Sequence, residues 1–200
     1  MELLRRRRGI FLDRDGTLCE NGAGYVGAVD KIVLRKGVRQ AVAAMAGAGY
    51  MLFLVTNQSA VGRGFFPLGV AMACNRRLFE LLGEESEFAA VCLSVGTPQL
   101  ADPYRKPSPK FLWEMCAKYA MEPADCWVIG NSACDLEMAK NAVAKAIMIC
   151  DCPKGPAFGN KPCQWTVPDL ESAWAVISAV DGEDVARINC RSGGFAVASR

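Results

Sequence analysis

Short apolar runs alternate along the chain with longer segments in which apolar residues recur at helical spacing. A buried strand typically reads as an unbroken apolar run, whereas an amphipathic helix repeats its apolar positions every three or four residues. Strands are therefore predicted at residues 10–12, 51–55, 88–95, 127–129 and 146–149. Helices are predicted at residues 38–48, 67–82, 108–119, 132–143 and 170–180. This alternation predicts an α/β fold in which helices cover both faces of a parallel sheet.

Polar residues follow several of these predicted strands at the point where each strand ends. Asp13 comes directly after the first strand, Thr56 after the second and Asn131 after the fourth. Parallel sheets place their binding sites beyond the carboxyl ends of the strands, so residues about 120 positions apart are expected to meet at one rim.

The composition is ordinary for a globular domain. The 200 residues are 52% hydrophobic, which excludes disorder over most of the chain. We interpret residues 1–180 as one domain. Residues 181–200 show no clear helical pattern and are interpreted as a tail that is peripheral or disordered.

Charge and special residues exclude several classes of function. Lys and Arg total 23 against 21 Asp and Glu, and this small net charge of +2 argues against a nucleic-acid partner. No apolar stretch reaches the roughly 20 residues that span a bilayer, so no membrane partner is expected. The chain has no histidine, which excludes a histidine base or metal ligand. Most of the ten cysteines sit in apolar runs as free thiols, which indicates a cytoplasmic location.

The first candidate motif is a pair of carboxylates in the segment FLDRDGTL. Asp13 and Asp15 are two positions apart, with Gly16 and Thr17 behind them. Carboxylates this close repel each other unless a cation neutralises them, and Mg²⁺ suits a site of few carboxylates plus a substrate phosphate. One aspartate could then act as nucleophile and the other as general acid and base. The alternative is a turn with two solvated aspartates.

Two further motifs carry groups that could bind phosphate. Thr56, Asn57 and Gln58 offer hydroxyl and amide donors at the end of the second strand, although a polar loop that caps the next helix would look the same. Lys106 could place a point charge on a phosphate, and Arg105 could grip one with its planar fork. Two solvated basic residues before a helix are the alternative.

The fourth motif, IGNSACD, allows two interpretations. Gly130 permits a tight exit from the strand, and Asn131 and Asp135 could face a metal ion. Ser132 and Asp135 also have the spacing of a capping box, which would make Asp135 a residue of the helix start.

In this order and at these strand ends, the four motifs resemble the haloacid dehalogenase superfamily of phosphatases over roughly residues 9–180. The segments FLDRDGTL, VTNQSAVGRGFF and RKPSP resemble in particular the branch of heptose-bisphosphate and histidinol-phosphate phosphatases. The resemblance implies a Rossmann-like fold. A cap domain needs roughly 50 residues, and the segments from Thr17 to the second strand and from Val95 to Lys106 are shorter, so no cap domain and an open site are expected.

The resemblance also implies a role for each matching residue. Asp13 would form an aspartyl-phosphate, and Asp15 would protonate the leaving oxygen and then activate water. Thr56 and Lys106 would hold the phosphoryl group. Mg²⁺ would be held by Asp13, Asp15, Asn131 and Asp135. Arg105 and the stretch Asn57, Gln58 and Ser59 would contact the substrate. Independently of the resemblance, Tyr25 and Arg63 are expected to contact it because they lie on short loops that would shape the site.

The chain departs from the branch at two places. Asn131 stands where the family has Asp, and an amide brings no charge, so metal affinity or turnover is expected to be lower unless Asp135 compensates. Many members of the branch carry a Cys/His zinc loop before the Arg-Lys-Pro segment. Residues 96–104 hold no Cys and the chain no His, so we predict no structural zinc.

Several functions remain open at this point. The leading hypothesis is a Mg²⁺-dependent phosphatase of a small phosphorylated sugar, similar to D-glycero-D-manno-heptose 1,7-bisphosphate 7-phosphatases. Histidinol phosphate or the 3′-phosphate of a polynucleotide are alternative substrates. Because of Asn131, a weakly active protein that binds a phosphorylated ligand is a further alternative.

Overall fold

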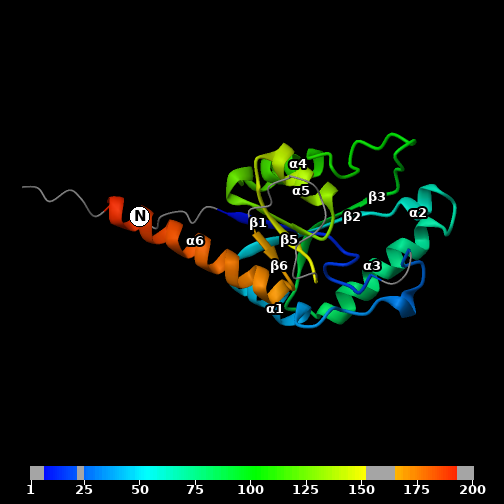
Figure 1. Ribbon diagram of the computed structural model, residues 1–200, viewed down its shortest axis with the longest axis horizontal. Coiled ribbons are helices and arrows are strands. Elements are labelled where there is room, and N and C mark those ends of the chain that lie inside the picture. The colour runs from blue at the N-terminus through cyan, green and yellow to red at the C-terminus, as the bar shows by residue number, and fades with distance from the viewer. Residues whose placement is uncertain (1–6, 22–24, 152–164, 193–200) are drawn as a thin grey trace, which may run out of the picture.

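The computed structural model describes residues 7–21, 25–151 and 165–192. Its centre is a parallel sheet of six strands in the order β3-β2-β1-β4-β5-β6 (Figure 1). The strands are β1 (Arg8–Leu12), β2 (Tyr50–Asn57), β3 (Phe88–Ser94), β4 (Trp127–Gly130), β5 (Lys145–Ile149) and β6 (Trp165–Val167). The α-helices are α1 (Val38–Gly47), α2 (Ser59–Gly62), α3 (Leu68–Leu82), α4 (Lys110–Tyr119), α5 (Ala133–Ala142) and α6 (Leu170–Ser192). Two short 3-10 helices are η1 (Val29–Lys31) and η2 (Pro123–Asp125).

Helices cover both faces of the sheet, as the sequence predicts. Helices α1, α3 and α6 pack on one face, and α4 and α5 on the other (Figure 1). Successive residues of a strand point to opposite faces, so Ile10 and Leu12 join the first core while Phe11 joins the second. The ring of Phe11 stacks on that of Phe53 in the neighbouring strand, with 4.5 Å between ring centroids. The central strands are apolar on both faces because both faces are buried.

The structure confirms the five strands and five helices that the periodicity predicts, and besides the two 3-10 helices it adds one short strand and one short α-helix. The edge strand β6 has three residues and α2 has four, which is too short for either to show a period. A correction concerns the C-terminus, since α6 continues beyond residue 180 to Ser192. The domain boundary expected at residue 180 therefore falls inside a helix, next to the buried Asp181. Residues 193–200 lie outside the described residues.

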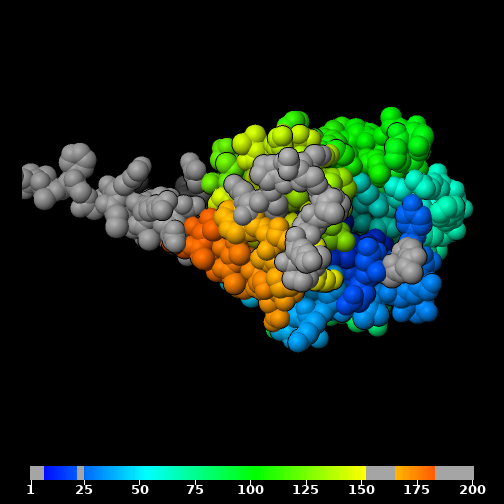
Figure 2. Space-filling view, in the orientation of Figure 1, coloured from blue at the N-terminus to red at the C-terminus, as the bar shows by residue number. Residues whose placement is uncertain are grey.

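The strand order places the carboxyl ends of β1, β2 and β4 side by side, at the edge of the sheet where its parallel strands end. Segments that follow β1 (blue), β2 (teal) and β3 (green) gather at one end of the molecule, away from the far end of α6 (Figure 2). In the described residues, the segment between β1 and α1 contains only η1, and the segment between β3 and α4 contains no further element. Neither forms a cap domain, so the edge is open.

Two other expectations concern cysteines and membranes. Seven cysteines in the described residues are free thiols, and five of them are buried. Among the helices that the structure describes, none has the length and apolar character that crossing a bilayer demands.

Candidate active site

The loop after β1 brings Asp13 and Asn131 to the same place. The backbone N–H of Asp13 donates to the carbonyl oxygen of Ile129 at 3.0 Å, which ties the ends of β1 and β4 together. Gly16 then turns the chain with a φ of +81°, and a Cβ atom there would lie 1.9 Å from the amide nitrogen of Asn131. Only glycine allows the loop to approach Asn131 this closely.

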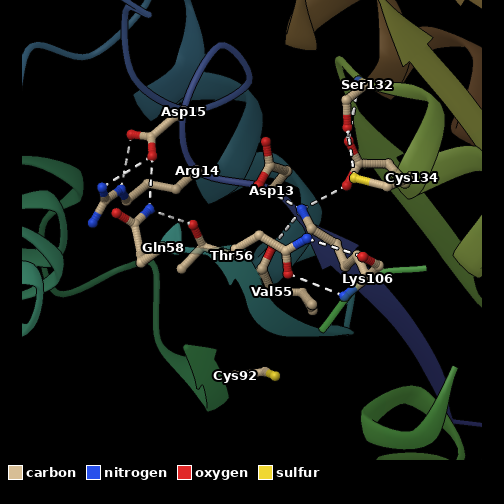
Figure 3. Close-up of polar contacts among 12 residues, drawn as sticks. Asp13, Arg14, Asp15, Val55, Thr56, Gln58, Cys92, Lys106, Ser132 and Cys134 are labelled. Atoms are coloured by element: carbon tan, nitrogen blue, oxygen red, sulfur yellow. Dashed lines mark hydrogen bonds and ion pairs between the residues drawn. The ribbon is translucent and has the colours of Figure 1, made fainter. Parts of the chain in front are cut away.

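Lys106 is a buried cation between two carboxylates (Figure 3). Its Nζ atom lies 2.6 Å from Oδ1 of Asp13 and 2.6 Å from Oδ1 of Asp135, and it donates to the carbonyl oxygen of Val55 at 2.9 Å. An ammonium group has three N–H donors, so these contacts use all of them. Lys106 therefore acts on the site chiefly through its charge and through its hold on Asp13.

The electrostatics of this cluster leave an excess of negative charge. Burial raises the pKa of Asp13 to about 7, although the charge of Lys106 opposes this, and the charges of Asp135 and Asp15 add to the rise. Burial by itself would lower the pKa of Lys106, but the attraction of Asp13 and Asp135 outweighs it and raises that pKa above its usual value. Lys106 is therefore charged, and one cation does not fully compensate its acidic neighbours.

The side chain of Asn57 holds the backbone of Lys106. Its Nδ2 atom donates to the carbonyl oxygen of Lys106 at 3.0 Å, and its Oδ1 atom accepts from the backbone N–H of Lys106 at 3.0 Å. We expected Asn57 to contact a substrate. It does line the cleft, but both ends of its amide are used to fix Lys106 in place.

Gln58 connects Thr56 with Asp15 (Figure 3). Its Nε2 atom donates to Oγ1 of Thr56 at 2.8 Å and to Oδ2 of Asp15 at 2.8 Å. The side chain is buried and does not line the cleft, so Gln58 orients two site residues, and the expected contact with a substrate stays a prediction. Arg14 also binds the Asp15 carboxylate, through two N–H donors at 2.9 and 3.0 Å.

Arg105 and Ser59 contact each other at the side of the site. The Nη1 atom of Arg105 donates to Oγ of Ser59 at 2.6 Å and to the carbonyl oxygen of Gly96 at 3.0 Å. Neither residue lines the cleft. Arg63 is exposed and also lies outside the cleft lining, so the structure does not bring it to the site as expected.

Asp135 forms the capping box at the start of α5, which confirms one of its two sequence interpretations. Its Oδ2 atom accepts from the backbone N–H of Ser132 at 3.1 Å, while its Oδ1 atom pairs with Lys106. Gly130 is needed at this point because a Cβ atom there would lie 2.3 Å from Oδ2 of Asp135. Asp135 is buried and does not line the cleft, so the structure shows its capping role, while its role as a metal ligand stays a prediction.

The cleft itself has a volume of about 200 Å³. It brings together four residues expected to be catalytic, which are Asp13, Asp15, Thr56 and Lys106. Two residues expected to bind substrate, Tyr25 and Asn57, also line it. The other lining residues are Asn21, Val26, Ser132 and Cys134. The sequence motifs give no signal for Asn21, which the loop after β1 brings to the cleft. Cys134 lies inside the fourth motif, in the first turn of α5, where its residue type indicated no role.

Comparisons with known proteins agree with this geometry. The model of the haloacid dehalogenase-like hydrolase family matches residues 21–142. The D-glycero-beta-D-manno-heptose-1,7-bisphosphate 7-phosphatase of Pseudomonas aeruginosa is 28% identical over 172 residues, which cover 86% of this chain and 96% of that protein. The protein of the same name from Mesorhizobium japonicum is 35% identical over 141 residues, covering 66% of this chain and 64% of its own length.

A solved structure supports the same assignment. The crystal structure of D,D-heptose 1,7-bisphosphate phosphatase from B. bronchiseptica, complexed with magnesium and phosphate, superposes with a TM-score of 0.77 at 25% identity. The match covers 88% of this chain and 99% of that one. Together with the family match over more than half of the sequence, these similarities show that the chain belongs to the haloacid dehalogenase-like hydrolases and is a phosphatase.

Proposed function

We propose that this phosphatase depends on Mg²⁺ and removes the 7-phosphate of D-glycero-D-manno-heptose 1,7-bisphosphate through an aspartyl-phosphate on Asp13. The observation that carries the chemistry is the contact of 2.6 Å between Asp13 and Lys106 in a cleft that Asp15 and Thr56 also line. The names of the relatives from P. aeruginosa and M. japonicum support the choice of substrate.

In the first step an oxygen of Asp13 attacks the phosphorus atom. As the bond from Asp13 to phosphorus forms, the bond from phosphorus to the sugar oxygen breaks, and Asp15 gives its proton to that oxygen. In the second step Asp15 takes a proton from water, which attacks the phosphorus atom and releases inorganic phosphate from Asp13. The hydroxyl of Thr56 donates to a phosphoryl oxygen, and the charge of Lys106 stabilises the developing negative charge.

The residues of the site fit a magnesium ion. Three carboxylates, of Asp13, Asp15 and Asp135, face two cations, Lys106 and Arg14, before a phosphate brings its own negative charge. Mg²⁺ takes oxygen ligands and keeps several waters. The carboxylate of Asp13, the backbone carbonyl of Asp15 and the side-chain oxygen of Asn131 would supply such ligands. When bound, the ion supplies the positive charge that lets a phosphate dianion approach Asp13.

A pair of aromatic residues, of which Tyr25 lines the cleft, supports a sugar as the substrate. Tyr25 lines the cleft and its ring lies 5.6 Å from the ring of Phe65. Both rings are largely exposed, at 48% and 64%. They come from different loops and offer an apolar surface to the carbon face of a sugar.

A kinetic comparison of four substrates with Mg²⁺ tests the proposal. The substrates are both anomers of heptose 1,7-bisphosphate, histidinol phosphate and a 3′-phosphorylated oligonucleotide, with Asp13→Asn as the inactive control. We expect the highest kcat/KM for one heptose anomer, with phosphorus NMR showing loss of the 7-phosphate. A higher value for histidinol phosphate would contradict the choice of sugar. If calorimetry shows that a phosphorylated compound binds but none of the four is hydrolysed, the function is binding of a phosphorylated ligand and not its hydrolysis.

A further inference from the structure

Arg14 stands between Asp13 and Asp15 in the sequence, and its charged side chain is fully buried. Its guanidinium is planar and carries five N–H donors in a fixed fork. The Nε atom donates to Oδ1 of Asp15 at 2.9 Å, and the Nη2 atom donates to Oδ2 at 3.0 Å (Figure 3). The fork therefore grips both oxygens of the same carboxylate.

The far side of the guanidinium is fixed to helix α3. The Nη1 atom of Arg14 donates to Oδ1 of Asn75 at 2.8 Å, and the side chain of Asn75 is itself buried. The backbone carbonyl of Arg14 accepts from the N–H groups of Leu18 and Cys19, both at 2.9 Å. Arg14 thus joins the loop after β1 to a helix that is 61 residues away in the sequence.

Counting acceptors shows which oxygen of Asp15 remains available. An ionised carboxylate offers about four lone-pair sites, two on each oxygen. Oδ2 accepts from Arg14 and from Nε2 of Gln58, so both of its sites are used. Oδ1 accepts only from Nε of Arg14 among the described contacts, which leaves one site on that oxygen. Asp15 lines the cleft and its side chain is 24% exposed, so this site is open to a reacting group.

We infer that Arg14 is the positioning residue for Asp15, and that it leaves Oδ1 as the oxygen that exchanges the proton with the leaving group and with water. This inference rests on the proposed function, in which Asp15 is the general acid and base. A carboxylate held at both oxygens cannot rotate, so its reactive oxygen keeps a fixed position relative to Asp13. A lysine could supply the charge of Arg14 but not the fork, because an ammonium group is a point charge.

The leaving group provides a readout that a merely structural role would not change. p-Nitrophenolate is a stable anion and leaves without a proton, whereas a sugar alkoxide must be protonated as it leaves. General acid catalysis contributes typically 10²–10⁴-fold, so it matters mainly for the sugar phosphate. The value of kcat/KM includes only steps up to the first irreversible one, which isolates the acid step from the later hydrolysis.

The test compares Arg14→Lys, Asn75→Ala and Asp15→Asn with the wild type on a sugar phosphate and on p-nitrophenyl phosphate. For Arg14→Lys we expect kcat/KM to fall by about 10²-fold on the sugar phosphate and by less than about 10-fold on the aryl ester. Asp15→Asn sets the full size of this difference. Asn75→Ala, which loosens only the far side of the fork, should show a smaller difference in the same direction.

A matched control lies on the same helix as Asn75. Arg77→Lys changes an exposed arginine whose Nη1 atom lies 3.1 Å from Glu80, and it should leave both substrates unaffected. Equal losses on the two substrates for Arg14→Lys and Asn75→Ala would overturn the inference while the proposed function stands. No turnover by the wild type would overturn both. If Arg14→Lys does not fold, Asn75→Ala by itself decides between the selective and the equal loss.

Discussion

Replacing Asp181 by alanine tests the contact that holds α6 against the sheet. The Asp181 carboxylate accepts hydrogen bonds from the phenol of Tyr50 and from Nε1 of Trp127, the latter at 3.1 Å. It also pairs with Lys145 at 2.7 Å and with Arg8 at 3.0 Å. These four partners are the first residues of β2, β4, β5 and β1, so one carboxylate links four strands at the edge opposite the cleft.

The expected loss of stability follows from what the substitution leaves behind. The Tyr50 hydroxyl and the Trp127 N–H are buried, and each donor left without an acceptor costs about 1–3 kcal/mol. The side chains of Arg8 and Lys145 are 27% and 21% exposed, so they can turn to water and add little. The free energy of unfolding should therefore fall by about 2–6 kcal/mol. For a chain of this size each kcal/mol lowers Tm by about 2–4 °C.

Thermal unfolding followed by circular dichroism measures this loss, and the activity of the folded variant should stay unchanged. Asp181→Asn keeps the size and one acceptor oxygen, so its Tm should lie between those of Asp181→Ala and the wild type. A drop in Tm of less than about 2 °C for Asp181→Ala would refute the reasoning. In the double variant with Tyr50→Phe one orphaned donor is gone, so the loss should be less than additive.

The same contact has a pH dependence with a definite sign. Burial raises the pKa of Asp181, but the hydrogen bonds from Lys145, Tyr50 and Trp127 outweigh it and lower the pKa below its ordinary value. The charged carboxylate therefore stabilises the fold above the unfolded pKa of about 3.9, and this stabilisation is lost as the pH falls through the lower folded pKa. As the pH falls from about 3.9 through the lower folded pKa of Asp181, the free energy of unfolding should therefore decrease less for Asp181→Ala than for the wild type.

Three further predictions concern the cleft. Asp13→Asn keeps the shape but removes the charge of the proposed nucleophile, so turnover should vanish with an unchanged circular dichroism spectrum; activity near that of the wild type would contradict the assignment. Asn57→Ala removes two hydrogen bonds of 3.0 Å to the backbone of Lys106, so steady-state kinetics should show a lower kcat with KM little changed, whereas a rise in KM alone would restore Asn57 as a substrate contact. Asn131→Asp adds a charged oxygen beside the loop of Asp13, and a Mg²⁺ titration of activity should reach its half-maximum at about tenfold lower concentration, an outcome that an unchanged titration curve would exclude.

Much of the fold and of the site could be predicted because the sequence patterns that indicate them are local. Strands buried on both faces must be apolar throughout, so Ile10–Leu12 and its counterparts are visible as runs in the sequence. The motifs of the site each occupy a few consecutive positions after a strand, and a parallel sheet brings such positions to one edge. For that reason the sequence was sufficient to predict that Asp13, Asp15, Thr56 and Lys106 meet, and the structure places all four around one cleft.

Only the tertiary structure decided what the neighbouring polar groups do. Asn57 lies 49 residues from Lys106, and Asp181 lies 131 residues from Tyr50. Local pattern shows that such a side chain is polar, but a buried polar group must find a partner, and the path of the chain determines which one is within reach. The same holds for Arg14 and Asn75, whose contact no periodicity encodes. The residue types at the site follow from the sequence, and their division into groups that face the cleft and groups that hold them in place follows from packing.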